Sequence, residues 1–192
     1  KARNVKVTCE TCPQYFSATD EEILSYNTNA KINPPLREES DCDAITEGLK
    51  DGTIDAIATD HAPHTPAEKA DFLHAPNGSI GMETSLFGTV GFETALSLAY
   101  TYLVDTGDLG ITDIVRLMSH NPAKLLGLPM VHIRPGSMAD IVVFDPTVSR
   151  TVKASELVSR GKNCLYDGWI LKGRVTDTIV GGAIKYHYGA NV

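Results

Sequence analysis

An apolar strand that ends abruptly in an acid and two histidines constrains the fold of this chain more than any other feature. Residues 54–59 are mostly apolar rather than alternating, which is typical of a parallel strand buried on both faces. Asp60, His61 and His64 follow the strand directly. In βα barrels, functional side chains lie where the strands end, at the carboxyl face. The pattern therefore predicts a functional site immediately after residue 59.

The same residues also have an ordinary interpretation. Asp60 can cap the next element while the two histidines stay solvated in a loop, and motifs this short often match by chance. An aspartate at a strand end can instead bind a metal ion, take a proton from a bound water and later return it. The segment alone leaves both interpretations open.

The segments around this strand indicate an α/β fold. Residues 5–8 are rich in β-branched side chains and predict a strand. Residues 40–51 predict a helix that Ser40 caps and that ends before Gly52. Strand, helix and strand in this order make the βαβ unit of a parallel sheet. Three further helices are expected, over residues 83–104, 112–118 and 122–126, the last of them capped by Asn121.

The chain changes character after Pro129. Strand-like segments replace the helices, and Gly181-Gly182 predicts a tight hairpin. The expected strands cover residues 139–144, 169–172, 175–180 and 183–188. We therefore divide the chain into residues 1–128, which carry the βαβ unit and the helices, and residues 129–192, which form a segment of a separate small β domain.

Composition excludes several classes of function. The 192 residues carry a formal net charge of −7 and no basic stripe, which argues against a nucleic-acid partner, because phosphate binding needs clustered lysine and arginine. No apolar run approaches the roughly 20 residues that a membrane span requires. Four cysteines in a chain of this length do not suggest a disulfide framework. The expected location is the cytoplasm.

Several segments resemble, in the same order, those of the bacterial-type dihydroorotases, which belong to the amidohydrolase superfamily of metal-dependent βα barrels. The strongest match lies between Lys31 and His64 and includes Asn33-Pro34-Pro35 and Asp60-His61-Ala62-Pro63-His64. The other matching segments are residues 10–15, 121–128, 168–169, 171–175 and 178–182. The resemblance covers nearly the whole chain.

This resemblance implies the C-terminal part of a metal-dependent (β/α)8 TIM barrel with an appended small β-sandwich domain. It implies a hydrolase that reversibly converts dihydroorotate to N-carbamoyl-L-aspartate in pyrimidine biosynthesis, acting on a small molecule as a homo-oligomer. It also implies two zinc ions (Zn2+) per full-length subunit, with every ligand except Asp60 preceding Lys1. We therefore expect a piece of a longer protein that is inactive by itself.

The resemblance assigns roles to five residues. Asp60 matches the aspartate that binds one zinc ion and shuttles the proton. His64 matches a contact to the substrate carboxylate, and Asn33 matches the asparagine that hydrogen-bonds the substrate ring. Asn77 and Gly78 fall where a loop lends backbone contacts to the ring, although the family usually has phenylalanine at the position of Asn77.

Alternatives remain inside and outside the enzyme class. Residues 12–15, Cys-Pro-Gln-Tyr, are closer to allantoinases and to hydantoinases or dihydropyrimidinases than to the Pro-His-His common in dihydroorotases. His64 argues against those enzymes, because a histidine suits a substrate that carries a carboxylate. A non-catalytic amidohydrolase-like scaffold is the alternative from another class. The scaffold interpretation is disfavoured because the chain retains Asp60, Asn33 and His64.

The remaining residues of metal-ligand type are isolated in the sequence. Cys9 and Cys12 have the spacing of a redox or zinc pair, but no second pair follows, so a packing role is favoured. Surface or hydrogen-bonding roles are favoured for the four other histidines, His74, His120, His132 and His187.

Overall fold

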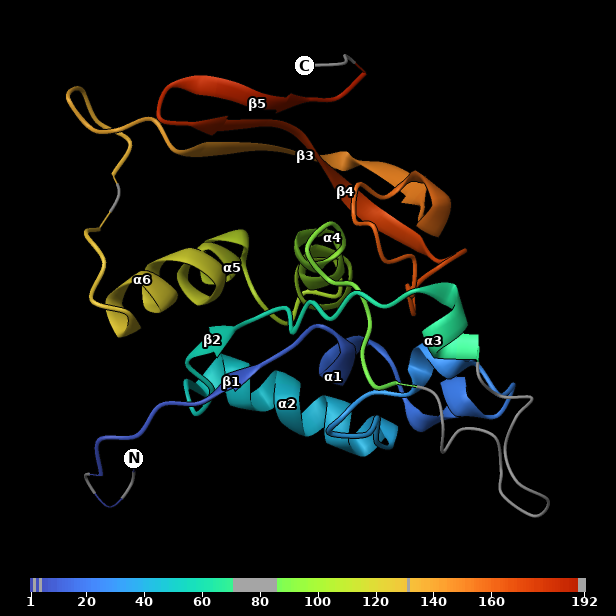
Figure 1. The fold of residues 1–192 in the computed structure, drawn as a ribbon. Helices are drawn as coiled ribbons and strands as arrows, with labels where there is room; N and C mark the ends of the chain where they lie inside the picture. The colour runs from blue at the N-terminus through green and yellow to red at the C-terminus, as the bar shows by residue number, and fades with distance from the viewer. Residues whose placement is uncertain (2, 4, 71–85, 131, 190–192) are drawn as a thin grey trace.

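Two small sheets on either side of a helical layer make up the computed structural model (Figure 1). The structure describes residues 1, 3, 5–70, 86–130 and 132–189. One sheet is the parallel pair β1 (Glu10–Thr11) and β2 (Ala56–Ile57). The other is antiparallel, in the order β3 (Ile141–Thr151), β4 (Ile170–Val180) and β5 (Ala183–His187).

The helices are short, with one exception. The α-helices are α1 (Gln14–Ser17), α2 (Glu39–Asp51), α3 (Pro66–Ala70), α4 (Ala95–Ala99), α5 (Ile111–Val115) and α6 (Asn121–Leu125). Single 3-10 turns occur at η1 (Asp20–Ile23), η2 (Thr28–Ala30) and η6 (Ala154–Glu156). Two π-helical segments, η4 (Tyr100–Val104) and η5 (Arg116–His120), extend α4 and α5.

The predicted βαβ unit forms, but its first strand lies further along the chain. β1 pairs with β2, and the backbone N–H of Asp55 donates to the carbonyl of Cys9 at 2.9 Å. The prediction of a strand over residues 5–8 is wrong. Val5 and Val7 are 59% and 53% exposed, and no described strand pairs with them. β-Branched residues favour a strand through packing against neighbours, which this segment lacks.

The helix predicted between the two strands is confirmed as α2. It ends at Gly52, whose φ of +79° is the left-handed conformation that glycine adopts at low cost. Its start differs from the prediction, because Ser40 lies in the first turn and the N-cap residue is Glu38, which makes no side-chain cap. Leu49 is fully buried and anchors the helix on the core.

The helix predicted from residue 83 begins at Ala95 instead. Residues 83–85 lie outside the described residues, and residues 86–94 are not helical. Their backbone groups bond across the molecule: Gly88 N–H donates to the carbonyl of Lys31 at 2.9 Å, and Val90 N–H donates to that of Asn163 at 3.0 Å. Groups committed to such long-range bonds cannot also form a helix.

Residues 111–125 form one continuous helical run rather than the two predicted helices. α5, η5 and α6 follow one another without a break. Asn121, predicted to cap the second helix, lies inside the run, and its side-chain amide donates to the carbonyl of Asp55 at 2.7 Å. This bond holds the run against the amino end of β2.

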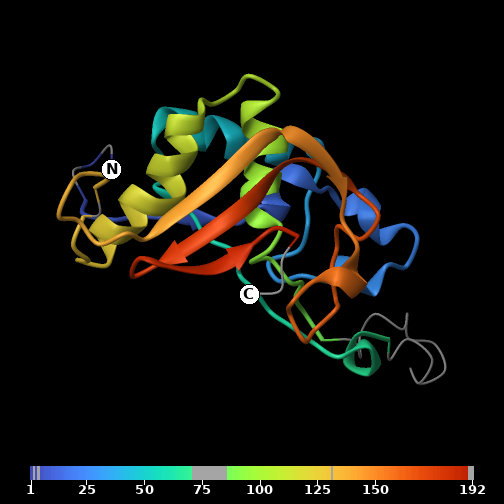
Figure 2. The same cartoon turned by 90° about the horizontal axis from the view of Figure 1, so that it is seen from above.

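The carboxyl-terminal sheet lies across α4 and α5 (Figure 2). β4 joins the two strands that were expected at residues 169–172 and 175–180. Gly173 makes this possible, because its φ is +80° and a Cβ there would meet the ring of Phe144 at 2.0 Å. The hairpin at Gly181-Gly182 is confirmed. Within the described residues the appended part contributes one three-stranded antiparallel sheet.

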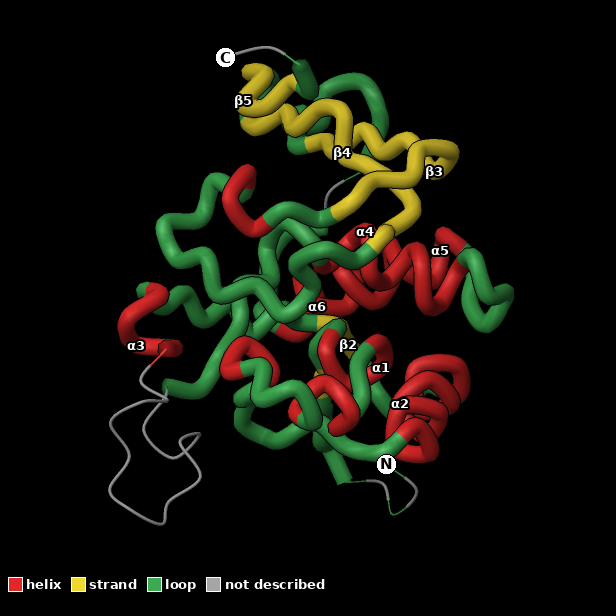
Figure 3. The backbone as a smooth tube through the Cα atoms, turned by 90° about the vertical axis from the view of Figure 1, so that its right-hand side faces the viewer, coloured by secondary structure: helices red, strands yellow, loops and turns green. Residues whose placement is uncertain are grey.

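The core joins segments that are far apart in the sequence, as the backbone trace in Figure 3 lets the reader follow. One buried cluster combines Ala18, Ala30, Ile32, Leu36, Val90 and Leu98 with Val152, Leu157, Cys164, Leu165, Tyr166 and Leu171. A second cluster surrounds α2, β2 and the run 111–125. Residues 152–171 thus pack on the first hundred residues, and the division at residue 128 stays a prediction. None of the helices in the described ranges has the length and apolarity that crossing a membrane requires.

Candidate functional site

Asp60 lies just after β2, where the sequence predicted a functional site. Its side chain is exposed, and its backbone has a φ of +47°. Few residues other than glycine adopt this left-handed conformation, and aspartate and asparagine adopt it more readily than most. The turn ends the strand and leaves the carboxylate open to solvent.

The loop after β1 lies beside Asp60. The pKa of the Cys12 thiol is raised to about 12, first by burial and then by the negative charges of Asp60 and Glu10. The pKa of the Tyr15 hydroxyl is also raised to about 12, by burial and by the charges of Cys12 and Asp60. β1 and β2 are parallel, and the backbone N–H of Ala58 donates to the carbonyl of Thr11 at 2.8 Å, so the carboxyl ends of the two strands form one edge.

Asn33 is brought to this edge through Tyr15. The Tyr15 hydroxyl donates to the carbonyl of Pro34 at 3.0 Å. Asn33 precedes Pro34 through a cis peptide bond, and its side chain is exposed. The Asn33 amide is therefore accessible to a ligand.

His61 bonds and stacks on the segment that precedes α4. Its Nδ1 accepts the backbone N–H groups of Gly91 at 3.1 Å and of Phe92 at 3.3 Å. Its ring stacks on that of Phe92, with centroids 4.1 Å apart and planes 2° apart. An Nδ1 that accepts two N–H groups carries no proton, so the neutral ring is protonated at Nε2. His61 therefore joins the loop after β2 to the start of the α4 segment.

His64 is half-buried, and its ring is held in place. Nε2 donates to the carbonyl of Phe87 at 2.8 Å, which fixes the proton on that nitrogen in the neutral ring. Nδ1 lies 3.9 Å from an oxygen of Glu68. The backbone N–H of His64 donates to Oδ1 of Asn163 at 2.8 Å. Because Nε2 is occupied, a further ligand of the ring would have to approach Nδ1, which already faces the carboxylate of Glu68.

Two residues near His64 were not singled out from the sequence. Asn163 is 4% exposed and bonds the loop after β2 from a point about a hundred residues later in the chain. Lys69, in α3, is 3% exposed and donates to the carbonyls of Lys31 at 3.3 Å and Leu86 at 2.8 Å. Burial, helped by the positive charge of Lys31, lowers the pKa of Lys69 to about 8. Neither residue belongs to a short motif, so only the fold could reveal them.

The other two residues assigned to the site, Asn77 and Gly78, lie outside the described residues. Their predicted backbone contacts to a substrate ring therefore stay predictions. The described part of the chain brings Asp60 beside the loop after β1 and connects Asn33 to that loop through Tyr15 and Pro34. His64 is attached instead to the segment around Phe87.

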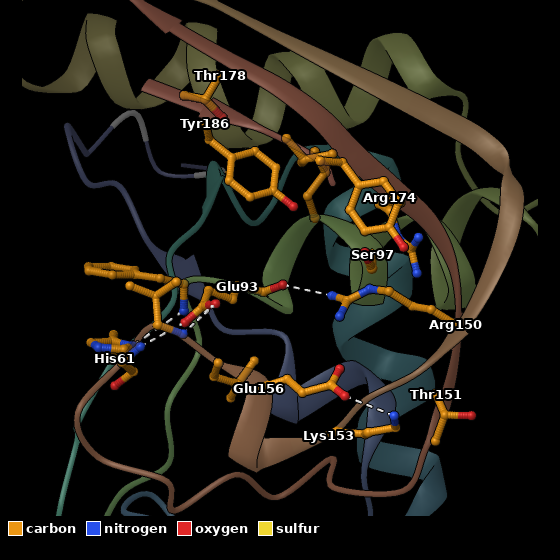
Figure 4. A pocket seen from close by; sticks show the side chains of 17 residues that line it. His61, Glu93, Ser97, Arg150, Thr151, Lys153, Glu156, Arg174, Thr178 and Tyr186 are labelled. Atoms are coloured by element: carbon orange, nitrogen blue, oxygen red, sulfur yellow. Dashed lines mark hydrogen bonds and ion pairs between the residues drawn. The ribbon is translucent and has the colours of Figure 1, made fainter. Parts of the chain in front are cut away.

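A cavity of about 680 Å³ lies between α4, the carboxyl-terminal sheet and the η6 segment (Figure 4). Arg150 donates to the carbonyl of Glu93 at 2.9 Å, and Lys153 pairs with Glu156 at 2.8 Å. Among the motif residues, only His61 lines the cavity; Asp60, Asn33 and His64 do not. Apart from His61, the residues predicted for the site therefore lie outside this cavity.

The residues that the structure describes do not assemble a metal centre by themselves. The described residues contain no group of three or more histidine, cysteine, aspartate or glutamate side chains that could hold a metal ion. A catalytic zinc generally has three protein ligands and one open position. Asp60 suits one of those ligands, because its carboxylate is exposed at a strand end. The remaining ligands would have to come from outside the described residues.

Comparison with known proteins identifies the family of this chain. The model of the amidohydrolase family matches residues 1–185. The chain belongs to the amidohydrolase family. It is 52% identical over 187 residues, 97% of its length, to a dihydroorotase of Geobacter metallireducens. It is 49% identical over 183 residues, 95% of its length, to a dihydroorotase of Ruminiclostridium cellulolyticum. The chain spans 42% and 40% of the lengths of these two amidohydrolases.

Solved amidohydrolase structures share the fold. The L-hydantoinase (dihydropyrimidinase) of Arthrobacter aurescens is 28% identical, with a TM-score of 0.88, and the D-hydantoinase (dihydropyrimidinase) of a Thermus species is 27% identical, with a TM-score of 0.86. All of this chain aligns with 42% of each of them. The predicted fold class is confirmed: the chain is part of a TIM barrel of the amidohydrolase type.

The two cysteines of the Cys9-x-x-Cys12 segment should differ in reactivity. Both are free thiols; Cys9 is exposed, whereas Cys12 is buried and its pKa is raised from 9.0 to about 12. Only the thiolate reacts with iodoacetamide. At pH 8 the thiolate fraction of Cys12 should therefore be about a thousandfold smaller than that of an ordinary thiol. Mass spectrometry of the alkylated native protein should find Cys9 modified first. Equal modification of the two would contradict the burial of Cys12.

Proposed function

We propose that this chain is part of a dihydroorotase, which hydrolyses the cyclic amide of dihydroorotate reversibly to N-carbamoyl-L-aspartate. The observation that carries the proposal is the identity of about half of the residues, over 95% or more of this chain, to curated dihydroorotases. The two hydantoinases named above share the fold, but at 28% and 27% identity. The exposed Asp60 carboxylate at a strand end supports a catalytic role over a scaffold role.

The proposed chemistry uses the groups at the end of β2. Water adds its oxygen to the ring carbonyl carbon, the carbon–nitrogen bond breaks, and the ring nitrogen gains a proton. Asp60 is the group that accepts the proton of the attacking water and returns it to the leaving nitrogen. Asn33, with its exposed amide, would hydrogen-bond the ring. A metal centre, for which we expect zinc, would polarise the carbonyl. Among the described residues, Asp60 is the one that we propose as a ligand of such a centre.

His64 would recognise the carboxylate of dihydroorotate. Because Nε2 donates to Phe87, the contact has to be made by Nδ1, which carries a proton only in the charged ring. Charge-assisted hydrogen bonds are the stronger class and suit an anionic substrate. We also propose that the full-length enzyme acts in the cytoplasm as a homo-oligomer, as is expected of an enzyme of pyrimidine biosynthesis.

Replacing His64 tests the substrate assignment. In the full-length enzyme, His64→Ala should raise the KM for dihydroorotate about tenfold or more, since a hydrogen bond to a charged group contributes about 1.5–3 kcal/mol. The KM for uncharged dihydrouracil should change far less. Steady-state kinetics on both substrates measures the difference. His120→Ala, at an exposed histidine on η5, is the matched control and should change neither. Equal losses for both substrates would show that His64 does not recognise the carboxylate.

A further inference from the structure

Three segments that are distant in sequence meet around one buried amide side chain. The side chain of Asn163 accepts the backbone N–H of His64 at 2.8 Å through Oδ1. Through Nδ2 it donates to the carbonyl of Ala62 at 2.9 Å and to that of Gly88 at 3.0 Å. One amide thus bonds the loop after β2 twice and the segment before α4 once.

The chemistry of this contact specifies asparagine. A side-chain amide offers two donors and an acceptor, and here both donors and the acceptor are in use. An aspartate would place an oxygen against the carbonyls of Ala62 and Gly88. An alanine would remove the partner of three backbone groups, of which that of Gly88 is buried and those of Ala62 and His64 are partly buried. Buried polar groups without partners are costly, so the network fixes where this loop lies.

We call these three bonds of the Asn163 side chain, to His64, Ala62 and Gly88, the junction. The main chain around Asn163 makes further bonds beside it. Its carbonyl accepts the N–H of Val90 at 3.0 Å and the hydroxyl of Thr89 at 3.0 Å. The Thr89 oxygen in turn accepts the N–H of Leu165 at 3.0 Å. Gly161 lies so close to the loop that a Cβ there would meet Pro63 Cβ at 2.6 Å. The segment 161–165 is therefore bonded and packed directly against the loop that carries Asp60 and His64.

We propose that Asn163 is a positioning residue for the active site, acting on substrate recognition through His64. The inference rests on the proposed function for its kinetic consequences, since it assigns a supporting role at the same site. Asn163 makes no contact with Asp60 that the structure describes, so its effect passes through the backbone of residues 62–64. A segment outside the βαβ unit, late in the chain, thereby sets the geometry of a loop that the sequence places a hundred residues earlier.

The test uses the full-length protein and three variants. Asn163→Ala removes the junction. Thr89→Val, which removes one hydroxyl at nearly constant volume, is the milder variant if Asn163→Ala folds poorly. Asn121→Ala is the matched control, because Asn121 also joins distant segments through one amide bond to a carbonyl, but at the opposite end of β2. Hydrogen–deuterium exchange of the peptide covering residues 59–70 and steady-state kinetics on dihydroorotate are measured for each.

Asn163→Ala should speed exchange of that peptide and raise the KM for dihydroorotate about tenfold, the effect of about 1.4 kcal/mol. In a His64→Ala background it should raise KM no further, because it acts through His64. Thr89→Val should change exchange and KM in the same direction, and Asn121→Ala should change neither. Unchanged exchange, or a KM effect that survives in the His64→Ala background, overturns the inference. A wild-type protein without dihydroorotase activity defeats the proposed function instead, and the exchange data still decide whether Asn163 positions the loop.

Discussion

Asp60→Asn in the full-length enzyme should lower kcat by at least about a hundredfold, the usual contribution of general acid–base catalysis. The substitution is well suited to this position. Asparagine adopts the left-handed conformation of residue 60 as readily as aspartate, so the backbone at φ +47° gains no strain. The amide keeps the shape of the carboxylate but cannot accept and return a proton. The loss should therefore appear in kcat and leave the folded structure intact.

Asp60→Asn also distinguishes three interpretations of Asp60: a catalytic residue, a cap of the following turn, and a residue of a protein without activity. If the residue only caps the following turn, asparagine should replace it with little change in activity or stability, because the two are near-equivalent caps. If the protein is a scaffold, neither form has activity to lose. Asp108→Asn, at an exposed aspartate that pairs with Lys50, is the control and should keep full activity. Measuring kcat, metal content and thermal unfolding for both variants distinguishes these accounts, and full activity in Asp60→Asn contradicts the proposed chemistry.

Gly161→Ala should destabilise the protein by about 1–3 kcal/mol, the usual cost of overpacking. The new Cβ would lie 2.6 Å from Pro63 Cβ and 2.8 Å from both Pro63 Cα and the backbone nitrogen of His64. Two of these are main-chain atoms, which cannot rotate away as a flexible side chain can. The segment 161–165 or the loop has to move, so the KM for dihydroorotate should rise as well.

A second glycine provides the comparison for that substitution. At Gly48, inside α2, an added Cβ would meet side-chain atoms alone: Cδ1 and Cγ1 of Ile54 at 3.1 Å and Cβ of Thr53 at 4.0 Å. Gly48→Ala should also gain helix propensity of about 1 kcal/mol, so little net loss is expected. Thermal unfolding should show a lower Tm for Gly161→Ala than for Gly48→Ala. A Tm for Gly161→Ala equal to that of the wild type would mean that the segment does not pack on Pro63.

Local chemistry made part of the fold predictable from the sequence. Gly52 ends α2 because glycine adopts a positive φ freely, and Gly181-Gly182 turns the hairpin for the same reason. The apolar run before Asp60 indicated a buried strand, and Ala56 and Ile57 of β2 are indeed 4% exposed each. In these cases a few adjacent residues decide the structure, so a short stretch of sequence carries the necessary information.

The predictions that proved wrong concern residues whose structure depends on partners far away in the sequence. Val5 and Val7 have strand propensity but no strand beside them, and Asn121 looks like a helix cap but bonds a carbonyl 66 positions away. Asn163 gave no signal, because its importance comes from three backbone groups in two other segments. The position of Asp60 after a buried strand was predictable, whereas its catalytic role stays a prediction. The network that holds its loop was not predictable, because that network exists only in the folded chain.

The central claim is tested most directly by the turnover of dihydroorotate by the purified full-length protein, compared with hydantoin, dihydrouracil and allantoin. We expect a kcat of roughly 10 per second on dihydroorotate, which is typical of enzymes, and a kcat/KM that exceeds those for the uncharged rings by about tenfold or more. A kcat/KM that is higher for hydantoin or dihydrouracil, or no turnover of any of the four in the presence of zinc, would contradict the account.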